Sequence, residues 1–187
     1  VPVELVAYDA AGRVVDALRA GAWDVAFLAI DPMRALEIAY SPPYVEIEGA
    51  YVVRDASAIR DNAAVDAPGV RVVVAQGAAY DLHLSRELKH ATLVRVPSSG
   101  AVVDAFLAGG YEVAAGVKQQ LEADARRHPG LRLLPGHFMV IRQAMGTPRG
   151  REAGARALAR FVEEMKASGF VARALGRHGV EGASVVR

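Results

Sequence analysis

Arg34 is the residue of this sequence whose position most strongly suggests binding chemistry. It follows Asp31 and Pro32, and an aspartate cap with proline at the first helical position is a preferred helix start. A cation near a helix N-terminus is disfavoured by the helix dipole by roughly 0.3–1 kcal/mol, so we expect an anionic group beside Arg34. The simplest such group is the carboxylate of Glu37 or Glu46 in a surface ion pair.

A second candidate is the stretch Gly77-Ala78-Ala79-Tyr80, where a predicted strand passes into a predicted helix. Free backbone N–H groups at a helix N-terminus can bind an anion without any side chain, so this stretch is a possible carboxylate site. The more common use of such a stretch is an ordinary tight turn, in which glycine supplies backbone freedom.

Other polar residues give weaker signals. The five histidines are scattered with no spacing that places two on one helix face near a carboxylate, so we expect no metal site. No nucleophile elbow, phosphate loop or dinucleotide-binding glycine pattern occurs in the right context, so we expect no cofactor. Glu48 and Glu112 are possible acids, but nothing pairs two carboxylates in an evident substrate site.

Composition excludes several classes of protein. A net charge of +1 over 187 residues gives no field that favours nucleic acid or an anionic membrane as partner. The absence of cysteine excludes a disulfide scaffold, a zinc–thiolate site and a thiol nucleophile. The apolar runs are too short to span a bilayer.

Short apolar runs alternate with amphipathic segments, which predicts an α/β fold with buried strands covered by helices. We expect Leu158, Phe161, Val162 and Met165 to form a core-facing stripe on the longest helix. A short helix should begin at 31–32, and Ser98 or Ser99 should cap the helix that runs to 107. The predicted strands cover residues 3–7, 25–30, 50–54, 70–74, 93–96, 113–115, 131–134 and 140–145, and the other predicted helices cover 10–20, 79–88, 118–127, 152–166 and 171–176.

Three strings taken together resemble amino-acid-type periplasmic solute-binding proteins of family 3, which serve ABC importers. They are Gly21-Ala22-Trp23-Asp24-Val25-Ala26-Phe27, Pro32-Met33-Arg34-Ala35 and Ile38-Ala39-Tyr40-Ser41-Pro42-Pro43-Tyr44. The match continues through residues 49–54, 66–77, 107–115, 145–149 and 161–169, so it covers essentially the whole chain.

The resemblance implies a two-lobed type II periplasmic binding fold with two hinge strands that closes over a small-molecule ligand. One lobe would comprise residues 1–53 and 142–187, and the other residues 54–141. It further implies ABC transporter permease subunits as partners, a periplasmic or extracytoplasmic location and no catalytic activity. Family members have a further strand and helix before the point where this sequence begins, and we expect that segment to belong to the protein.

The resemblance also assigns ligand-binding positions, and several carry unusual residues here. For Arg34 it implies, instead of a surface ion pair, a forked contact with a ligand carboxylate. Asp31 stands where threonine is customary, although its role as a helix cap is sufficient by itself, and Val117 replaces the acid that holds an α-ammonium group. We therefore expect a carboxylate or other small polar solute rather than glutamine, lysine or arginine. The predicted ligand-binding residues are Arg34, Asp31, Ala29, Ala11, Gly77, Ala78, Ala79, Tyr80 and Val117.

Two alternatives remain open at this point. A few relatives of the same fold act as dehydratases on a bound carboxylate, and Glu48 or Glu112 would then have to be the acid or base. The chain could also be the ligand-sensing domain of a membrane receptor.

Overall fold

The structure, a computed structural model, describes residues 2–186 and contains a nine-stranded sheet in the order β1-β8-β3-β6-β4-β5, with β2, β7 and β9 paired off this path. The strands are β1 (Ala26–Ala29), β2 (Ile38–Tyr40), β3 (Val45–Arg54), β4 (Arg71–Ala75), β5 (Thr92–Val96), β6 (Val113–Val117), β7 (Leu131–Leu133), β8 (Met139–Pro148) and β9 (Ser184–Val185). The helices are α1 (Ala11–Arg19), α2 (Ala79–Glu87), α3 (Val102–Ala108), α4 (Lys118–Arg127), α5 (Glu152–Ala167) and α6 (Phe170–Arg177), with short 3-10 turns η1 (Arg34–Leu36), η2 (Ala63–Val65) and η3 (Ser99–Ala101).

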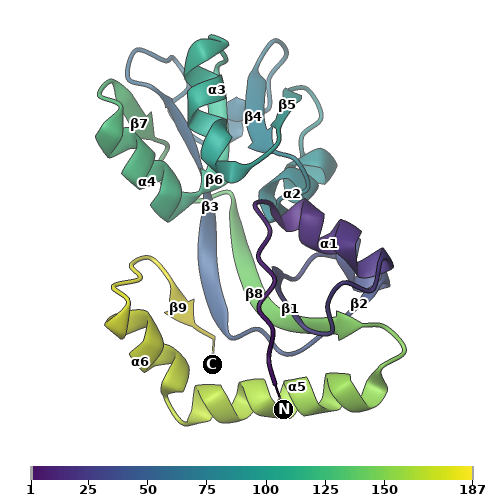
Figure 1. The fold of residues 1–187 in the computed structure, drawn as a ribbon. Coiled ribbons are helices and arrows are strands. Elements are labelled where there is room, and N and C mark those ends of the chain that lie inside the picture. Colours follow the sequence, from purple (N-terminus) through teal and green to yellow (C-terminus); the bar gives the residue numbers. More distant parts are fainter. Residues whose placement is uncertain (1, 187) are drawn as a thin grey trace.

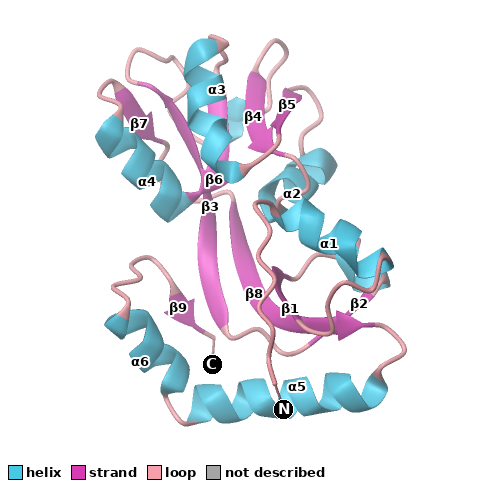
Figure 2. Cartoon of the chain, viewed as in Figure 1, coloured by secondary structure: helices cyan, strands magenta, loops and turns pink. Residues whose placement is uncertain are grey.

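The elements fall into two groups joined by β3 and β8, the long strands at the centre of Figure 1. An upper group contains the elements between β3 and β8 in the sequence, from η2 to β7. A lower group contains α1, β1, η1, β2, α5, α6 and β9 (Figure 2). In the upper group β4 pairs in parallel with both β5 and β6, so the carboxyl ends of these three strands lie at one edge.

Each group has its own apolar core. The upper core consists of the valine-rich strands β4 and β6 packed against Phe106 and Leu84, which are almost completely buried. The lower core contains Trp23, Leu28 and Ile38, against which the apolar face of α1 packs. Buried strands rich in β-branched residues are typical of sheets covered by helices, so the expected mixed α/β fold is confirmed.

Most predicted elements lie within a few residues of the observed ones, and α4 has the predicted bounds. The short helix after Asp31 is a single 3-10 turn, and strands β2 and β9 have no counterpart in the prediction. The serine cap predicted before residue 107 is wrong. No side chain caps η3 or α3, because the Ser99 hydroxyl instead forms a 2.9 Å hydrogen bond with the Tyr80 hydroxyl.

The predicted strand at residues 3–7 is wrong. These residues form no strand, and Val3 and Leu5 are 81% and 89% exposed. A strand needs a neighbour to pair its N–H and C=O groups, and none of the strands within residues 2–186 pairs with this segment. Among the strands of the described chain, β1 pairs only with β8, so its other edge has no strand partner there.

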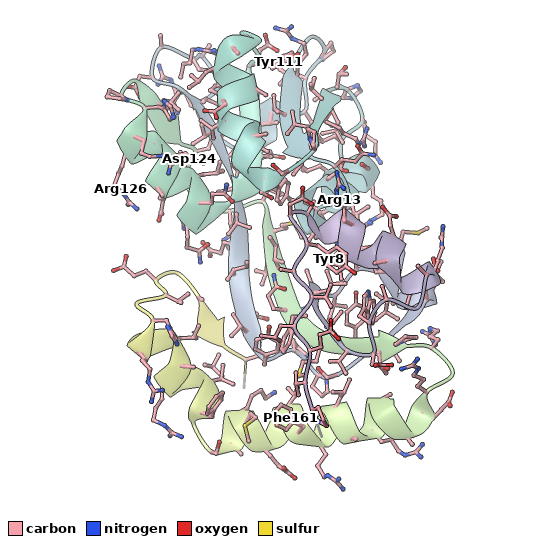
Figure 3. The ribbon with its side chains drawn as sticks, in the orientation of Figure 1. Tyr8, Arg13, Tyr111, Asp124, Arg126 and Phe161 are labelled. Atoms are coloured by element: carbon pink, nitrogen blue, oxygen red, sulfur yellow. The ribbon has the colours of Figure 1, made fainter. Side chains whose placement is uncertain are left out.

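The apolar stripe predicted on the longest helix is only partly buried. Val162 is buried, whereas Phe161 is 47% exposed (Figure 3). Phe161 lines an apolar groove of about 450 Å³ with Phe27, Met145 and Phe170. The helical periodicity was therefore correct, but periodicity does not specify how completely a face is covered. None of the helices described is long and apolar enough to cross a membrane.

Candidate functional site

The contacts between the upper and lower groups mark the candidate site. They involve the loop after β4, at the carboxyl edge of the parallel strands, where α/β sheets usually bind ligands. In the lower group, α1 and the loop between β1 and η1 face this edge (Figure 1). Three of the predicted ligand-binding residues, Arg34, Asp31 and Gly77, form these contacts.

Arg34 joins the two groups. Its guanidinium donates one hydrogen bond to the Ala29 carbonyl at 3.0 Å and one to the Gly77 carbonyl at 2.7 Å. The side chain is only 4% exposed, and its Nε has no hydrogen-bond partner within the described part of the chain. Burial lowers the pKa of the Arg34 guanidinium from its ordinary value, although arginine stays protonated in proteins. The structure therefore holds a buried cation with one unused donor between the groups.

The alternative of a surface ion pair for Arg34 is wrong. Glu37 pairs instead with Arg19 at 2.8 Å, and Glu46 pairs with Arg142 at 2.8 Å. No carboxylate among residues 2–186 forms an ion pair with Arg34, so its only partners are neutral carbonyl oxygens. Asp31 is close enough to act on Arg34 electrostatically, but its carboxylate pairs with Arg86, so the forked contact of Arg34 with a ligand carboxylate stays a prediction.

Asp31 also connects the groups. Its Oδ1 accepts the Met33 N–H at 2.8 Å, a turn contact that lies before the 3-10 turn. The predicted role of Asp31 as a helix cap is wrong, because the turn begins at Arg34 with Met33 at its N-cap and no side chain caps it. Its Oδ2 forms a 2.9 Å ion pair with Arg86, from α2 of the upper group. The Asp31 side chain is 3% exposed, so this ion pair is largely shielded from water. The prediction missed Arg86, because its position in a helix 55 residues away gives no local signal of the pairing.

The Gly77 turn is in close contact with the start of α1. Gly77 has φ +71°, and a Cβ added to it would lie 3.0 Å from the Cα of Gly12. This close backbone contact, together with the positive φ, requires glycine at position 77. The Gly77 N–H is not free, because it donates to the Asp81 carboxylate at 2.8 Å, and the Ala78 N–H bonds to the Ala75 carbonyl. The expectation that the backbone N–H groups of this turn are free to bind an anion is therefore wrong for Gly77 and Ala78.

The remaining predicted residues lie in four different settings. Ala78, Ala79 and Tyr80 are buried in the upper core, so their side chains pack inside the protein. Ala29 contributes its carbonyl to Arg34, and its side chain is buried. Ala11 packs against the lower core. Val117 lies at the carboxyl end of β6 and lines a separate cavity with residues of α4.

The two acids considered for catalysis are both engaged by cations. Glu48 accepts hydrogen bonds from Lys118 at 2.7 Å and pairs with His137 at 2.8 Å, and these partners hold its pKa below the ordinary value. Glu112 pairs with Arg71 through both oxygens, which lowers its pKa to about 2. A general acid at neutral pH must hold a proton, and both side chains are arranged to stay ionised. No group of three metal-ligating side chains occurs within residues 2–186.

Glu112 makes stability depend on pH. A carboxylate whose pKa is lower in the folded protein stabilises it above the ordinary value of 4.5, and this contribution is lost as pH falls toward 2. We expect Glu112→Gln to lower the free energy of unfolding at pH 7 and to flatten its decline between pH 4.5 and 2. Urea titrations at several pH values measure this, and an unchanged slope would show that the Glu112–Arg71 pair does not contribute.

Comparisons with known proteins identify the family. The pattern of the bacterial extracellular solute-binding proteins, family 3, matches residues 1–180. No curated protein matches the chain. A solved receptor for L-cysteine from Neisseria gonorrhoeae is 20% identical with a TM-score of 0.77, over 89% of this chain and 68% of that one. An ABC transporter binding component from Wolinella succinogenes, solved with lysine, is 17% identical with a TM-score of 0.77, over 95% and 78%.

A further solved structure, the holo arginine-binding protein of T. maritima, is 19% identical with a TM-score of 0.74, over 87% of this chain and 72% of that one. At these identities the likeness establishes the fold, a mixed α/β fold matching type II periplasmic binding proteins. The family match extends over nearly all of the sequence, from the first residue through α6. The chain belongs to the bacterial extracellular solute-binding proteins, family 3.

Proposed function

We propose that this protein is the extracytoplasmic solute-binding component of an ABC uptake transporter and that it captures a small carboxylate-bearing or polar solute. The upper group with the end of β3, residues 54–141, would form one lobe. Residues 1–53 and 142–187 would form the other. β3 and β8 would act as hinge strands, because they are the two strands that pass between the groups (Figure 1).

The observation that carries this proposal is the position of Arg34. Arg34 is 4% exposed and forms no ion pair within residues 2–186, and the nearby Asp31 carboxylate is already paired with Arg86, so an anion that reaches Arg34 would stabilise it further. Its Nη atoms touch both lobes through Ala29 and Gly77, and its Nε has a free donor. A ligand carboxylate could therefore replace the Gly77 carbonyl and form a forked contact with two guanidinium nitrogens.

Closure of the two lobes would then follow, because both lobes contact the same solute. A solute held by Arg34 of one lobe and by the N-terminal turn of α2 of the other binds fully only when the lobes meet. The Asp31–Arg86 ion pair and the Gly12–Gly77 backbone contact would form in the same closed state. Both contacts join residues of different lobes, so both favour closure without touching the solute.

The proposed solute class follows from the solutes of solved relatives and from the residue at one position that the family resemblance assigns to the solute. Solved relatives of this fold are described with cysteine, lysine or arginine, so a solute of amino-acid size is expected here. Val117 offers no charge at the position where the family resemblance implies an acid for the α-ammonium group. A carboxylate without an adjacent ammonium, such as succinate, therefore suits this chain better than an α-amino acid.

A thermal-shift screen tests the proposal. We expect small carboxylates to raise the unfolding temperature more than the matched α-amino acids do, for example succinate more than aspartate. A ligand at one hundred times its Kd stabilises the folded state by about 2.7 kcal/mol, which such a screen resolves. Equal or larger shifts with α-amino acids would overturn the solute class. No shift with any carboxylate, amino acid or sugar would overturn the proposed function.

A further inference from the structure

A second cavity lies away from Arg34, between α4 and the loop that joins α6 to β9. Its volume is about 470 Å³. Ile47 of β3 and Val117 of β6 form its apolar floor, and Gln119, Glu122 and Arg126 of α4 line one side. The opposite side is formed by residues 179–181, which include Glu181. Figure 3 shows Arg126 projecting from α4.

Most polar side chains around this cavity lack hydrogen-bond or ion-pair partners among residues 2–186; the exception is Gln120, which donates to the Ser99 carbonyl at 3.0 Å. Neither Glu122, Arg126 nor Glu181 forms an ion pair with any residue of the described chain, although Glu122 and Arg126 are one turn apart. The Gln119 Oε1 is fully buried and accepts no hydrogen bond from residues 2–186. A buried acceptor without a donor costs about 1–3 kcal/mol, so the Gln119 amide would be stabilised if it turned to accept a hydrogen from a ligand in the cavity.

The lining favours one kind of ligand. Two carboxylates and the Gln119 carbonyl oxygen are acceptors, whereas Arg126 is the single cationic group, so the lining carries a net charge of −1. Acceptors arranged around a space of this size fit a cationic nitrogen with several N–H groups, as in an amine or a guanidinium compound. The apolar floor of Ile47 and Val117 fits its carbon chain.

The sheet separates this cavity from the Arg34 contacts. β9 pairs with β3 on the edge away from β8, while β1 pairs with β8 on the edge away from β3. The local order is therefore β9-β3-β8-β1. The cavity lies beside β3 and β9, and Arg34 follows β1, with α1 and α2 on that side in Figure 1. The cavity and the Arg34 contacts therefore lie on different sides of the β3–β8 pair.

We propose that the cavity between α4 and residues 179–181 is a second ligand-binding site, which takes a small organic cation with N–H donors. Glu122 and Glu181 pair with the cationic nitrogen, and Gln119 accepts one of its hydrogens. Arg126 lies at the edge of the site and repels the positively charged ligand. This site does not depend on the Arg34 contacts, because it shares none of their residues.

Titration with agmatine tests the site, since agmatine carries two cationic groups and no carboxylate. Calorimetry should give saturable binding at millimolar or lower concentration, and amide shifts in a ¹⁵N spectrum should centre on residues 119–126 and 179–181. Glu122→Gln and Glu181→Gln should each weaken binding about tenfold, as expected for the loss of a charge-assisted contact. Arg126→Gln should tighten binding several-fold, because it removes the like charge.

The matched control is Glu164→Gln, which changes an exposed glutamate of α5 whose nearest cation, Arg160, lies 3.8 Å away. It should leave agmatine binding unchanged. Absence of saturable agmatine binding, equal binding by Glu122→Gln and Glu164→Gln, or amide shifts centred on residues 77–80 would each overturn the second site. Succinate binding at Arg34 is measured separately, so either site can fail while the other holds.

Discussion

Replacing Arg34 with lysine should weaken binding of the preferred carboxylate by about 10- to 100-fold. Lysine keeps the positive charge but has no planar fork, so it cannot contact a carboxylate through two nitrogens. It also cannot reach the Ala29 and Gly77 carbonyls with the geometry that Arg34 uses. Hydrogen bonds to charged groups contribute about 1.5–3 kcal/mol each, which corresponds to this range. Calorimetric titration with the acid that gives the largest thermal shift measures the effect.

Arg19→Lys is the control for Arg34→Lys. Arg19 also makes a two-nitrogen contact, with Glu37, but it lies on the exposed side of α1. Affinity should not change in this variant. Urea unfolding of both variants separates lost binding from lost folding, because a folded Arg34→Lys protein with wild-type affinity would contradict the role given to Arg34.

Gly77→Ala should both destabilise the protein and impair solute binding. At φ +71° an alanine costs about 1–2 kcal/mol, and its Cβ would lie 3.0 Å from the Cα of Gly12. The methyl group would push α1 away from the α2 turn and would shift the Gly77 carbonyl that Arg34 contacts. We expect a lower free energy of unfolding and an affinity at least tenfold weaker.

Gly110→Ala provides a control with the same backbone strain. Gly110 has φ +60°, and nothing lies within 4 Å of a Cβ placed on it. It should therefore lose about as much stability as Gly77→Ala from strain alone, with unchanged affinity. If the two variants lose stability and affinity equally, the Gly12–Gly77 contact has no role in bringing the groups together.

The parts of the fold that were predictable from the sequence are those set by residues close together in the chain. Helix α4 has the predicted bounds, because its polar and apolar residues alternate with the helical period and its ends are clear. A polar contact between Asp31 and the backbone just after it was also predictable, since it joins residues only two positions apart, although it does not cap the 3-10 turn. The absence of a strand at residues 3–7 was not predictable from local patterns, because apolar residues form a strand only where a neighbouring strand pairs with them.

The candidate site was predictable in its residues but less so in its contacts. Arg34 and Gly77 were singled out from their positions at helix starts, yet their hydrogen bond spans 43 residues and has no local signature. The same holds for Asp31 and Arg86, which meet across 55 residues. The buried setting of Ala78 and Tyr80 also depends on the packing of α2 against the sheet, which no short pattern specifies.

The central claim is that a carboxylate brings the two groups together, and spin-label distances test it most directly. The chain has no cysteine, so Asp16→Cys on α1 and Glu87→Cys on α2 create one labelled site in each group. Labels at Glu87→Cys and Asp104→Cys, both in the upper group, serve as the control pair. The account predicts that a saturating carboxylate narrows and shortens the 16–87 distance distribution while the 87–104 distribution stays fixed. An unchanged 16–87 distribution with the carboxylate demonstrably bound would contradict it.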